Sequence, residues 1–277
     1  MECVTIEWEG EQAHLVLDGP RCNAIGQGML AGLESALDVL EARRPSVLVI
    51  SSRDPAGFCQ GDDLIEAHAR FVGRDSALHR MVDRILPSRR LDPMLDALAV
   101  HAFLRRINAV LTRLERLPCP VVCVVHGLCM GGGWELVAAC DLVIAEESAR
   151  FGLPELRLAT LPAFGAVPRL ERDLGTALLR DLLLSGRTVS AKRLHALGVL
   201  HQVVPRGKGA QAARGLAKRL GALDPAVVRH TKAFVKPTPW GRLLEERLRV
   251  LALTRRAPFR EALRRFAEAA PRPLSYL

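Results

Sequence analysis

Aromatic side chains are scarce in this 277-residue sequence, since Phe, Trp and Tyr together make up 4% of it. The core must therefore be built mainly from Leu, Val, Ile and Ala. Few aromatics also leave few platforms on which nucleotide bases could stack, which argues against a nucleic-acid partner. No uncharged segment approaches the roughly 18 residues that a membrane-spanning helix requires. The sequence gives no reason to expect a membrane partner.

Paired cysteine motifs are also absent. The seven cysteines are scattered without a CxxC pair and lie mostly within apolar segments, which favours reduced, buried thiols over a disulfide framework. The first residues, MECVTIEWEG, lack the basic start and apolar stretch of a secretory signal. We therefore expect a cytoplasmic protein. The eight histidines form neither HExxH nor a cluster with metal-ligand spacing, so no metal is expected.

The charge is unbalanced, with 39 Lys and Arg against 30 Asp and Glu and a formal net charge of +9. Such a balance favours acidic partners, which include phosphate-bearing substrates, acidic carrier proteins and nucleic acid. It does not choose between them. An RNA-binding or scaffolding protein therefore stays open as a non-enzyme alternative.

Hydrophobic periodicity predicts strands alternating with helices, the pattern of an α/β fold. The N-terminal segments VTIEWEG and AHLVLDG predict a β-hairpin. Beyond the linker RGKG at 206–209 only helices are expected. We therefore predict a core over residues 1–205, with a long, partly helical and mobile insertion at about 66–100, and a helical C-terminal domain over 206–277. The expected helices are 23–43, 104–117, 134–140, 174–184, 191–197, 210–220, 225–234, 241–253 and 258–269, and the expected strands of the core are 46–50, 121–125, 141–145 and 199–205.

Two glycine-containing turns follow predicted strands. GLCMGGGWEL at 127–136 leads from an apolar strand into an apolar helix, and FCQGDDL at 58–64 follows the strand SVLVI. Backbone N–H groups at such turns can hold an anion or an oxyanion. The first run contains neither GxxxxGK[ST] nor GxGxxG, so it predicts no nucleotide site. By itself it is equally compatible with a simple bend.

Two glutamates lie near these turns. Glu135 is in the first turn of the helix after the glycines, and Glu155 directly follows Pro154. A carboxylate on each side of a substrate suits general acid and base catalysis. Each Glu alone is also explained by the preference of acidic residues for helix N-termini.

With these residues in place, the sequence resembles the enoyl-CoA hydratase/isomerase family, or crotonase superfamily. The resemblance covers most of residues 1–205 and extends more loosely to DPAVVRHTKAF. It rests on the segments CNAIGQGMLAGLESAL, LVISSRDPAGFCQGDDL, PCPVVCVVHGLCMGGGWELVAACDLVIAEESARFGLPELRLATLP and LLLSGRTVSAKRLHALGVLHQVVP.

The resemblance implies a crotonase-like spiral of ββα units with a C-terminal helical trimerisation domain, giving homotrimers or hexamers. It implies an acyl thioester of coenzyme A or of a carrier protein as substrate, so that coenzyme A or phosphopantetheine enters with the substrate and no separate cofactor is needed. By position, the backbone N–H groups of Gln60 and Gly132 would form the oxyanion hole. Substrate contacts are implied for Cys22, Ala24, Asp62, Asp63, Leu64, Trp134 and Pro162.

Family members that hydrate a 2-enoyl thioester are similar to this chain in having both glutamates. The resemblance thus implies a lyase in which Glu135 activates water and Glu155 exchanges the C2 proton, in hydration or in the reverse dehydration. Isomerases often keep only the second Glu, so an isomerase or decarboxylase, for example in polyketide biosynthesis, is the enzyme alternative. Trp134 and the segment PAFGAV at 162–167 depart from the family pattern. Lys232 is expected by analogy to contact adenosine phosphates, and His126 to hold the turn.

Overall fold

The computed structural model describes residues 3–71 and 92–269. Its larger sheet has six strands in the order β1-β2-β3-β5-β7-β10. β1 and β2 form the predicted antiparallel hairpin, and the other neighbours are parallel. The bounds of these strands are Val4–Glu9 (β1), Gln12–Leu17 (β2), Val47–Ser52 (β3), Val121–Val125 (β5), Leu142–Glu146 (β7) and Gln202–Val204 (β10).

A second sheet of four short strands runs in the order β4-β6-β8-β9. Its strands are Gly57–Cys59 (β4), Leu128–Met130 (β6), Arg150–Gly152 (β8) and Val189–Ser190 (β9). Each of β3, β5 and β7 in the large sheet is followed along the chain by a strand of the small sheet and then by helix. The chain thus repeats a ββα unit three times, which is the spiral that the sequence predicted.

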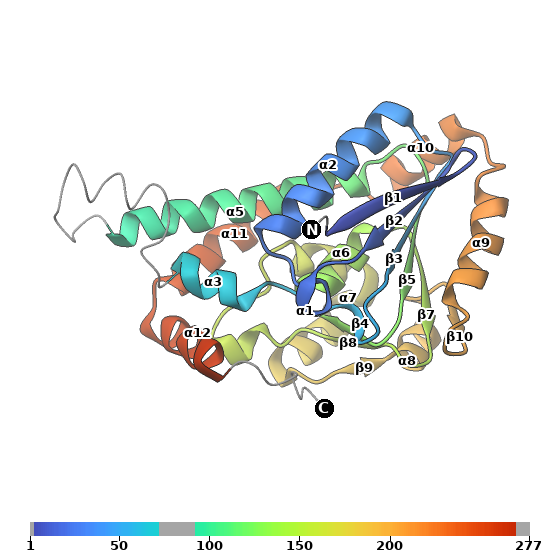
Figure 1. Ribbon diagram of the computed structural model, residues 1–277. Helices are drawn as coiled ribbons and strands as arrows, with labels where there is room; N and C mark the ends of the chain where they lie inside the picture. Colours follow the sequence, from blue (N-terminus) through green and yellow to red (C-terminus); the bar gives the residue numbers. More distant parts are fainter. Residues whose placement is uncertain (1–2, 72–91, 270–277) are drawn as a thin grey trace.

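Helices surround the two sheets (Figure 1). Their bounds are Pro20–Asn23 (α1), Gln27–Arg43 (α2), Leu64–Phe71 (α3), Asp92–Glu115 (α5), Gly132–Ala139 (α6), Glu155–Leu158 (the 3₁₀ turn η1), Ala166–Ser185 (α7), Ala191–Ala196 (α8), Gly209–Leu220 (α9), Pro225–Val235 (α10), Trp240–Thr254 (α11) and Ala257–Ala269 (α12). No helix within residues 3–71 or 92–269 is long and apolar enough to cross a membrane.

The parallel strands are apolar because helices cover both faces of the sheet. Every residue of β5 is buried. On one face α9 packs on β3, β5 and β7 and forms a separate apolar cluster with them, while α2, α5 and α6 belong to the main core on the other (Figure 1). The first helix of the predicted C-terminal domain is therefore a packed layer of the sheet.

Most predicted elements are confirmed to within one or two residues, but several bounds differ. The helix predicted over 104–117 begins at Asp92, because Pro93 lies in its first turn, where proline costs no hydrogen bond. The helix predicted over 174–184 begins at Ala166 and continues through a kink at Gly175. Within the predicted insertion, α3 and the start of α5 account for residues 66–71 and 92–100. Residues 72–91 of that insertion lie outside the described part of the chain.

The helices after α9 approach the start of α3 from the other end of the sequence. α12 packs against α3 and η1, and α11 packs against α5 and α7 (Figure 1). Phe259 and Leu263 of α12 form a small apolar cluster with Ala67 of α3. α3 and α12, which lie about 190 residues apart in sequence, are therefore in contact.

Candidate active site

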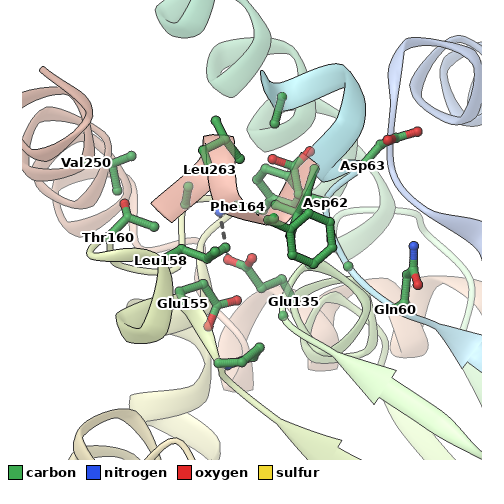
Figure 2. A pocket seen from close by; sticks show the side chains of 18 of the residues that line it. Gln60, Asp62, Asp63, Glu135, Glu155, Leu158, Thr160, Phe164, Val250 and Leu263 are labelled. Carbon is green, nitrogen blue, oxygen red and sulfur yellow. Dashed lines mark hydrogen bonds between the residues drawn. The ribbon is translucent and has the colours of Figure 1, made fainter. Parts of the chain in front are cut away.

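One cavity of about 540 Å³ lies where the glycine turns, η1 and the C-terminal helices meet. Eight of the predicted site residues line it. They are Cys22, Gln60, Asp62, Asp63, Leu64, Gly132, Glu135 and Glu155. Figure 2 shows the carboxylates of Glu135 and Glu155 close to one another in this cavity.

The two predicted glycine turns touch each other. Gly61 has a φ of +105° and packs so tightly that a Cβ on it would lie 2.8 Å from the Met130 carbonyl oxygen and 3.2 Å from the Gly132 nitrogen. Gly132 is the first residue of α6, so its N–H has no acceptor within that helix. The positive end of the α6 dipole thus lies at the cavity wall.

The predicted role of the Gln60 N–H is wrong as stated, because that group is already bonded. It donates to the Cys22 carbonyl oxygen over 2.9 Å, and the next N–H, of Gly61, approaches the Cys59 sulfur at 3.4 Å. Asp62 then forms a parallel bridge with Ile25 through its two neighbours, the Gly61 carbonyl and the Asp63 N–H. In such a bridge the N–H of the central residue points to the opposite side of the strand.

Glu135 is held by the turn that begins α7. Its Oε1 accepts hydrogen bonds from the N–H groups of Phe164 at 2.7 Å and Ala166 at 2.8 Å. Both of these bonds go to the same carboxylate oxygen. The side chain is 2% exposed. Burial raises the pKa of Glu135 well above its usual range, the charges of Glu246 and Glu155 raise it further, and the two N–H bonds oppose this.

Glu155 is held differently. Its Oε2 is buried and has no hydrogen-bond partner among the residues that the structure describes. Burial raises its pKa to about 8, with the charges of Glu246 and Asp62 contributing. The two carboxyl groups thus differ in their hydrogen-bond partners, since Glu135 accepts two backbone N–H bonds and Oε2 of Glu155 accepts none from the described residues.

Asp63 lines the cavity but is used by the fold. Its Oδ1 accepts from the N–H groups of Ile65 and Glu66 and so caps α3, and its Oδ2 pairs with Arg21. Asp62, the neighbouring predicted contact, lies beside Phe164 in Figure 2 and raises the pKa of Glu155 through its charge. Of these two carboxylates, Asp62 is therefore the one that acts on the catalytic pair.

Three predicted substrate contacts do not line the cavity: Ala24, Trp134 and Pro162. Trp134 is 1% exposed and packs on Phe151 with ring centroids 5.4 Å apart, so it fills the core beside Glu135. An indole on the inner face of a buried helix turns away from the wall that Glu135 faces.

Two further predictions concern basic side chains. Lys232 donates to the Cys119 carbonyl over 2.6 Å and pairs with Asp141 at 2.6 Å. Its ammonium group is thus engaged within the fold, against the prediction of a phosphate contact. His126 lies outside the cavity wall, and its Nε2 is 2.8 Å from the Asp54 carbonyl oxygen, as expected for a residue that holds the turn.

Sequence reasoning missed the far wall of the cavity. That wall is apolar and comes from α5, α11, α12 and the segment before α7, with the side chains Val100, Phe103, Leu104, Phe164, Val250, Phe259, Leu263 and Phe266. Phe103 and Phe164 meet edge to face with centroids 5.9 Å apart. Nothing in the local sequence distinguishes these residues from ordinary core positions.

The sequence matches one family model and several curated proteins. Residues 99–271 match the family model described as enoyl-CoA hydratase/isomerase. The chain is 31% identical over 192 residues to the mitochondrial methylglutaconyl-CoA hydratase of Rattus norvegicus, a match that covers 69% of this chain and 53% of that protein. It is 31% identical over 229 residues to the mitochondrial enoyl-CoA hydratase domain-containing protein 2 of Bos taurus, covering 80% of this chain and 69% of that protein.

Solved structures show the same fold. A putative enoyl-CoA hydratase from Streptomyces avermitilis superposes with a TM-score of 0.78 at 20% identity, covering 97% of this chain and 92% of that one. An enoyl-CoA hydratase from Geobacillus kaustophilus gives a TM-score of 0.68 at 26% identity, covering 91% of this chain and 89% of that one. The chain spans about half the length of the methylglutaconyl-CoA hydratases that it matches. The spiral fold, the paired glutamates and these matches together show that the chain belongs to the enoyl-CoA hydratase/isomerase family.

Proposed function

We propose that this protein adds water across the double bond of a 2-enoyl thioester, or catalyses the reverse dehydration of a 3-hydroxyacyl thioester. The observation that carries the proposal is the pair of buried glutamates with opposite surroundings. Glu135 accepts two backbone N–H bonds, and Glu155 has an oxygen with none. One ionised and one protonated carboxyl group is what this addition requires.

In this mechanism Glu135 holds a water molecule through Oε2, the oxygen that the N–H groups leave unused. Glu135 takes a proton from the water while the water oxygen bonds to C3. The electron pair of the double bond moves toward the thioester carbonyl and forms an enolate. Glu155 then gives its proton to C2 as the carbonyl forms again. Transfer of one proton from Glu135 to Glu155 restores the starting state of the pair. The reverse order of steps eliminates water.

The enolate oxygen requires two hydrogen-bond donors. We assign them to the N–H groups of Gly132 and Asp62, and the Asp62 N–H takes the place predicted for Gln60. Support comes from the contact of the two turns at Gly61 and from the bridge to Ile25, which turns the Asp62 N–H away from that strand. The N-terminus of α6 adds its dipole at the same point.

The acyl group is proposed to be apolar. The cavity wall beyond the glutamates is formed by Leu and Phe side chains of α5 and α12. Among the described residues, a carboxylated acyl group would be buried without a cationic partner along that wall, because the arginines that line the cavity, Arg21 and Arg157, come from α1 and η1. The carrier is coenzyme A or a carrier protein, either of which suits the net charge of +9.

A homotrimeric or hexameric assembly is part of the proposal. α10 and α11 expose large apolar side chains, among them Phe234 at 89% and Trp240 at 59%. Exposed apolar groups on neighbouring helices are typical of protein interfaces. Light scattering tests the assembly: Phe234→Asp is expected to yield a smaller particle than the wild type.

The reaction is tested by the loss of ultraviolet absorbance of the conjugated enoyl thioester. Crotonyl-CoA and a longer 2-enoyl-CoA are the substrates, and Glu147→Gln, an exposed carboxylate paired with Lys192, is the control. Glu135→Gln and Glu155→Gln are each expected to lower turnover on the order of 10² to 10⁴-fold with thioester binding retained. Full activity in both variants refutes the assignment. Exchange of solvent deuterium without net hydration indicates isomerase chemistry instead.

A further inference from the structure

A third buried glutamate lies next to the catalytic pair. Glu246 belongs to α11 and is 4% exposed, yet it does not line the cavity. Its Oε1 accepts from the Gly165 N–H at 2.7 Å, and its Oε2 accepts from the Val167 N–H at 2.9 Å. Because burial of a carboxylate is costly, this arrangement calls for an explanation beyond stability.

The turn that Glu246 binds is the turn that binds Glu135. Residues 164–167 present four successive backbone N–H groups, and these alternate between the two carboxylates. Phe164 and Ala166 donate to Glu135. Gly165 and Val167 donate to Glu246. Any displacement of the turn toward or away from Glu246 therefore moves the two donors that fix the Glu135 carboxylate.

We propose that Glu246 is a positioning residue for the catalytic base, which clamps the 164–167 turn from behind so that Glu135 presents one fixed oxygen to water. This inference rests on the proposed hydration reaction. It extends the reaction centre to α11, about 110 residues along the chain from Glu135, and gives that helix a role in the rate of the chemical step.

The charges around Glu246 make its effect measurable. Arg169 of α7 and Arg242 of α11 lower its pKa, and Glu135 of α6 and Glu155 of η1 are the acidic groups that its own charge affects. Burial is the largest effect and raises the pKa of Glu246 to about 7. When ionised, Glu246 raises the pKa of Glu135, so removing its charge makes Glu135 easier to ionise.

The test compares Glu246→Gln, which keeps the size and removes the charge, with Glu246→Asp, which keeps the charge and shortens the side chain. Glu245→Gln is the matched control, because Glu245 is the preceding residue of α11 and pairs with Arg249 on the surface. The measurements are kcat and KM for 2-enoyl-CoA hydration from pH 5 to 9, with the folded fraction at each pH checked by circular dichroism. In Glu246→Gln the side-chain amide keeps one oxygen acceptor, and its NH₂ group faces the backbone N–H of Gly165 or Val167. Two donors repel one another, so the 164–167 turn must shift.

Glu246→Gln is expected to lower kcat about 10-fold to 100-fold with little change in KM, since a displacement of about 1 Å in a catalytic group has such an effect. The acidic limb of the pH profile of kcat is expected to move to lower pH in this variant. Glu246→Asp is expected to lower kcat without moving that limb, and Glu245→Gln to match the wild type. If Glu246→Gln does not fold, Val167→Pro, which removes one donor to Glu246 in the first turn of α7, replaces it and is expected to lower kcat in the same way.

A folded Glu246→Gln protein with the kcat and pH profile of the wild type overturns the inference. The inference is also overturned if the loss of kcat in Glu246→Gln is no larger than the fraction of that variant that is unfolded. The two proposals fail separately, because a wild-type protein that hydrates no enoyl thioester refutes the proposed function, whereas an active wild type with unaffected variants refutes only the role of Glu246.

Discussion

Gly131 lies so close to Glu155 that a Cβ on Gly131 would be 2.5 Å from the carboxylate oxygen Oε1. The same glycine immediately precedes α6, the helix that carries Glu135, and its carbonyl accepts the Glu135 N–H at 3.0 Å. One residue thus sets the spacing between the two elements that supply the acid and the base.

Gly131→Ala is therefore expected to displace Glu155 and to lower kcat for hydration about 10-fold to 100-fold. The φ of +48° at this position adds backbone strain. Gly175→Ala is the control, since Gly175 has a φ of +74° and nothing within 4 Å of the added carbon. The control is expected to lose stability and keep its kcat. Equal kcat values in the two variants would show that the Gly131 contact does not matter for the reaction.

The raised pKa of Glu155 predicts an alkaline limit to hydration. Below a pH of about 8 this carboxyl group carries the proton that C2 receives, and above it the proton is lost. We expect kcat to fall as the pH rises through about 8 and the residual rate of Glu155→Gln to show no such decline. Initial rates in a series of buffers at constant ionic strength measure this.

The same shift predicts how stability depends on pH. The folded protein keeps the Glu155 proton between the usual pKa of 4.5 and about 8, whereas the unfolded chain loses it, so this group makes folding less favourable as the pH rises through that window. Glu155→Gln is expected to reduce the drop in melting temperature between pH 5 and pH 8.5. An equal or larger drop in the variant would contradict the burial of a protonated Glu155.

Arg169 joins three parts of the core around the turn that binds Glu135. Its fully buried guanidinium donates to Glu115, Thr112 and the Phe164 carbonyl. Arg169→Met leaves these acceptors with fewer partners and is expected to lower the free energy of unfolding on the order of 3 kcal/mol. Arg187→Met removes an exposed pair with Asp181 and is expected to change the free energy of unfolding much less. Urea unfolding of both variants measures the difference.

The apolar wall predicts a length-dependent effect on substrate choice. Leu263 of α12 lines the far end of the cavity and is 1% exposed. Leu263→Trp is expected to lower kcat/KM at least 10-fold for a long 2-enoyl-CoA and much less for crotonyl-CoA, because the larger side chain fills the space of the distal carbons. Leu248→Trp, on an exposed position of α11, is expected to change neither value. Loss of activity toward both thioesters in Leu263→Trp would place this wall nearer to the reacting carbons.

The alternation of strands and helices was predictable from the sequence because the strands are either alternating or fully apolar and the helices end at Gly and Pro signals, whereas the spiral arrangement was implied by the family resemblance. The strand Val121–Val125 was predicted to the residue. The three-residue strands β4, β6 and β8 were missed, since segments so short carry no periodicity. β6 lies inside the turn predicted at 127–136 and β4 overlaps the turn predicted at 58–64, so the position of the site was predicted without these strands.

The candidate site was predictable where its residues are close in sequence and not where they are distant. Glu135, Glu155 and Gly132 come from the segment 127–155 and line one cavity as expected. Gln60 was chosen although its N–H is bonded to the Cys22 carbonyl, because the N–H that a turn leaves unbonded depends on contacts that the local sequence does not show. Glu246 and Leu263 come from helices whose packing no local pattern reveals.

The residues proposed to carry out the reaction and the residues proposed to bind the acyl chain come from different parts of the sequence. The groups assigned to bond making and breaking come from residues 62–155. The apolar wall proposed to limit the length of the acyl group comes in large part from residues 250–266. α12 touches α3 and η1, but no hydrogen bond of Glu135 involves it. Substitutions on the cavity face of α12 can therefore change which acyl chain fits while the groups assigned to the reaction stay in place.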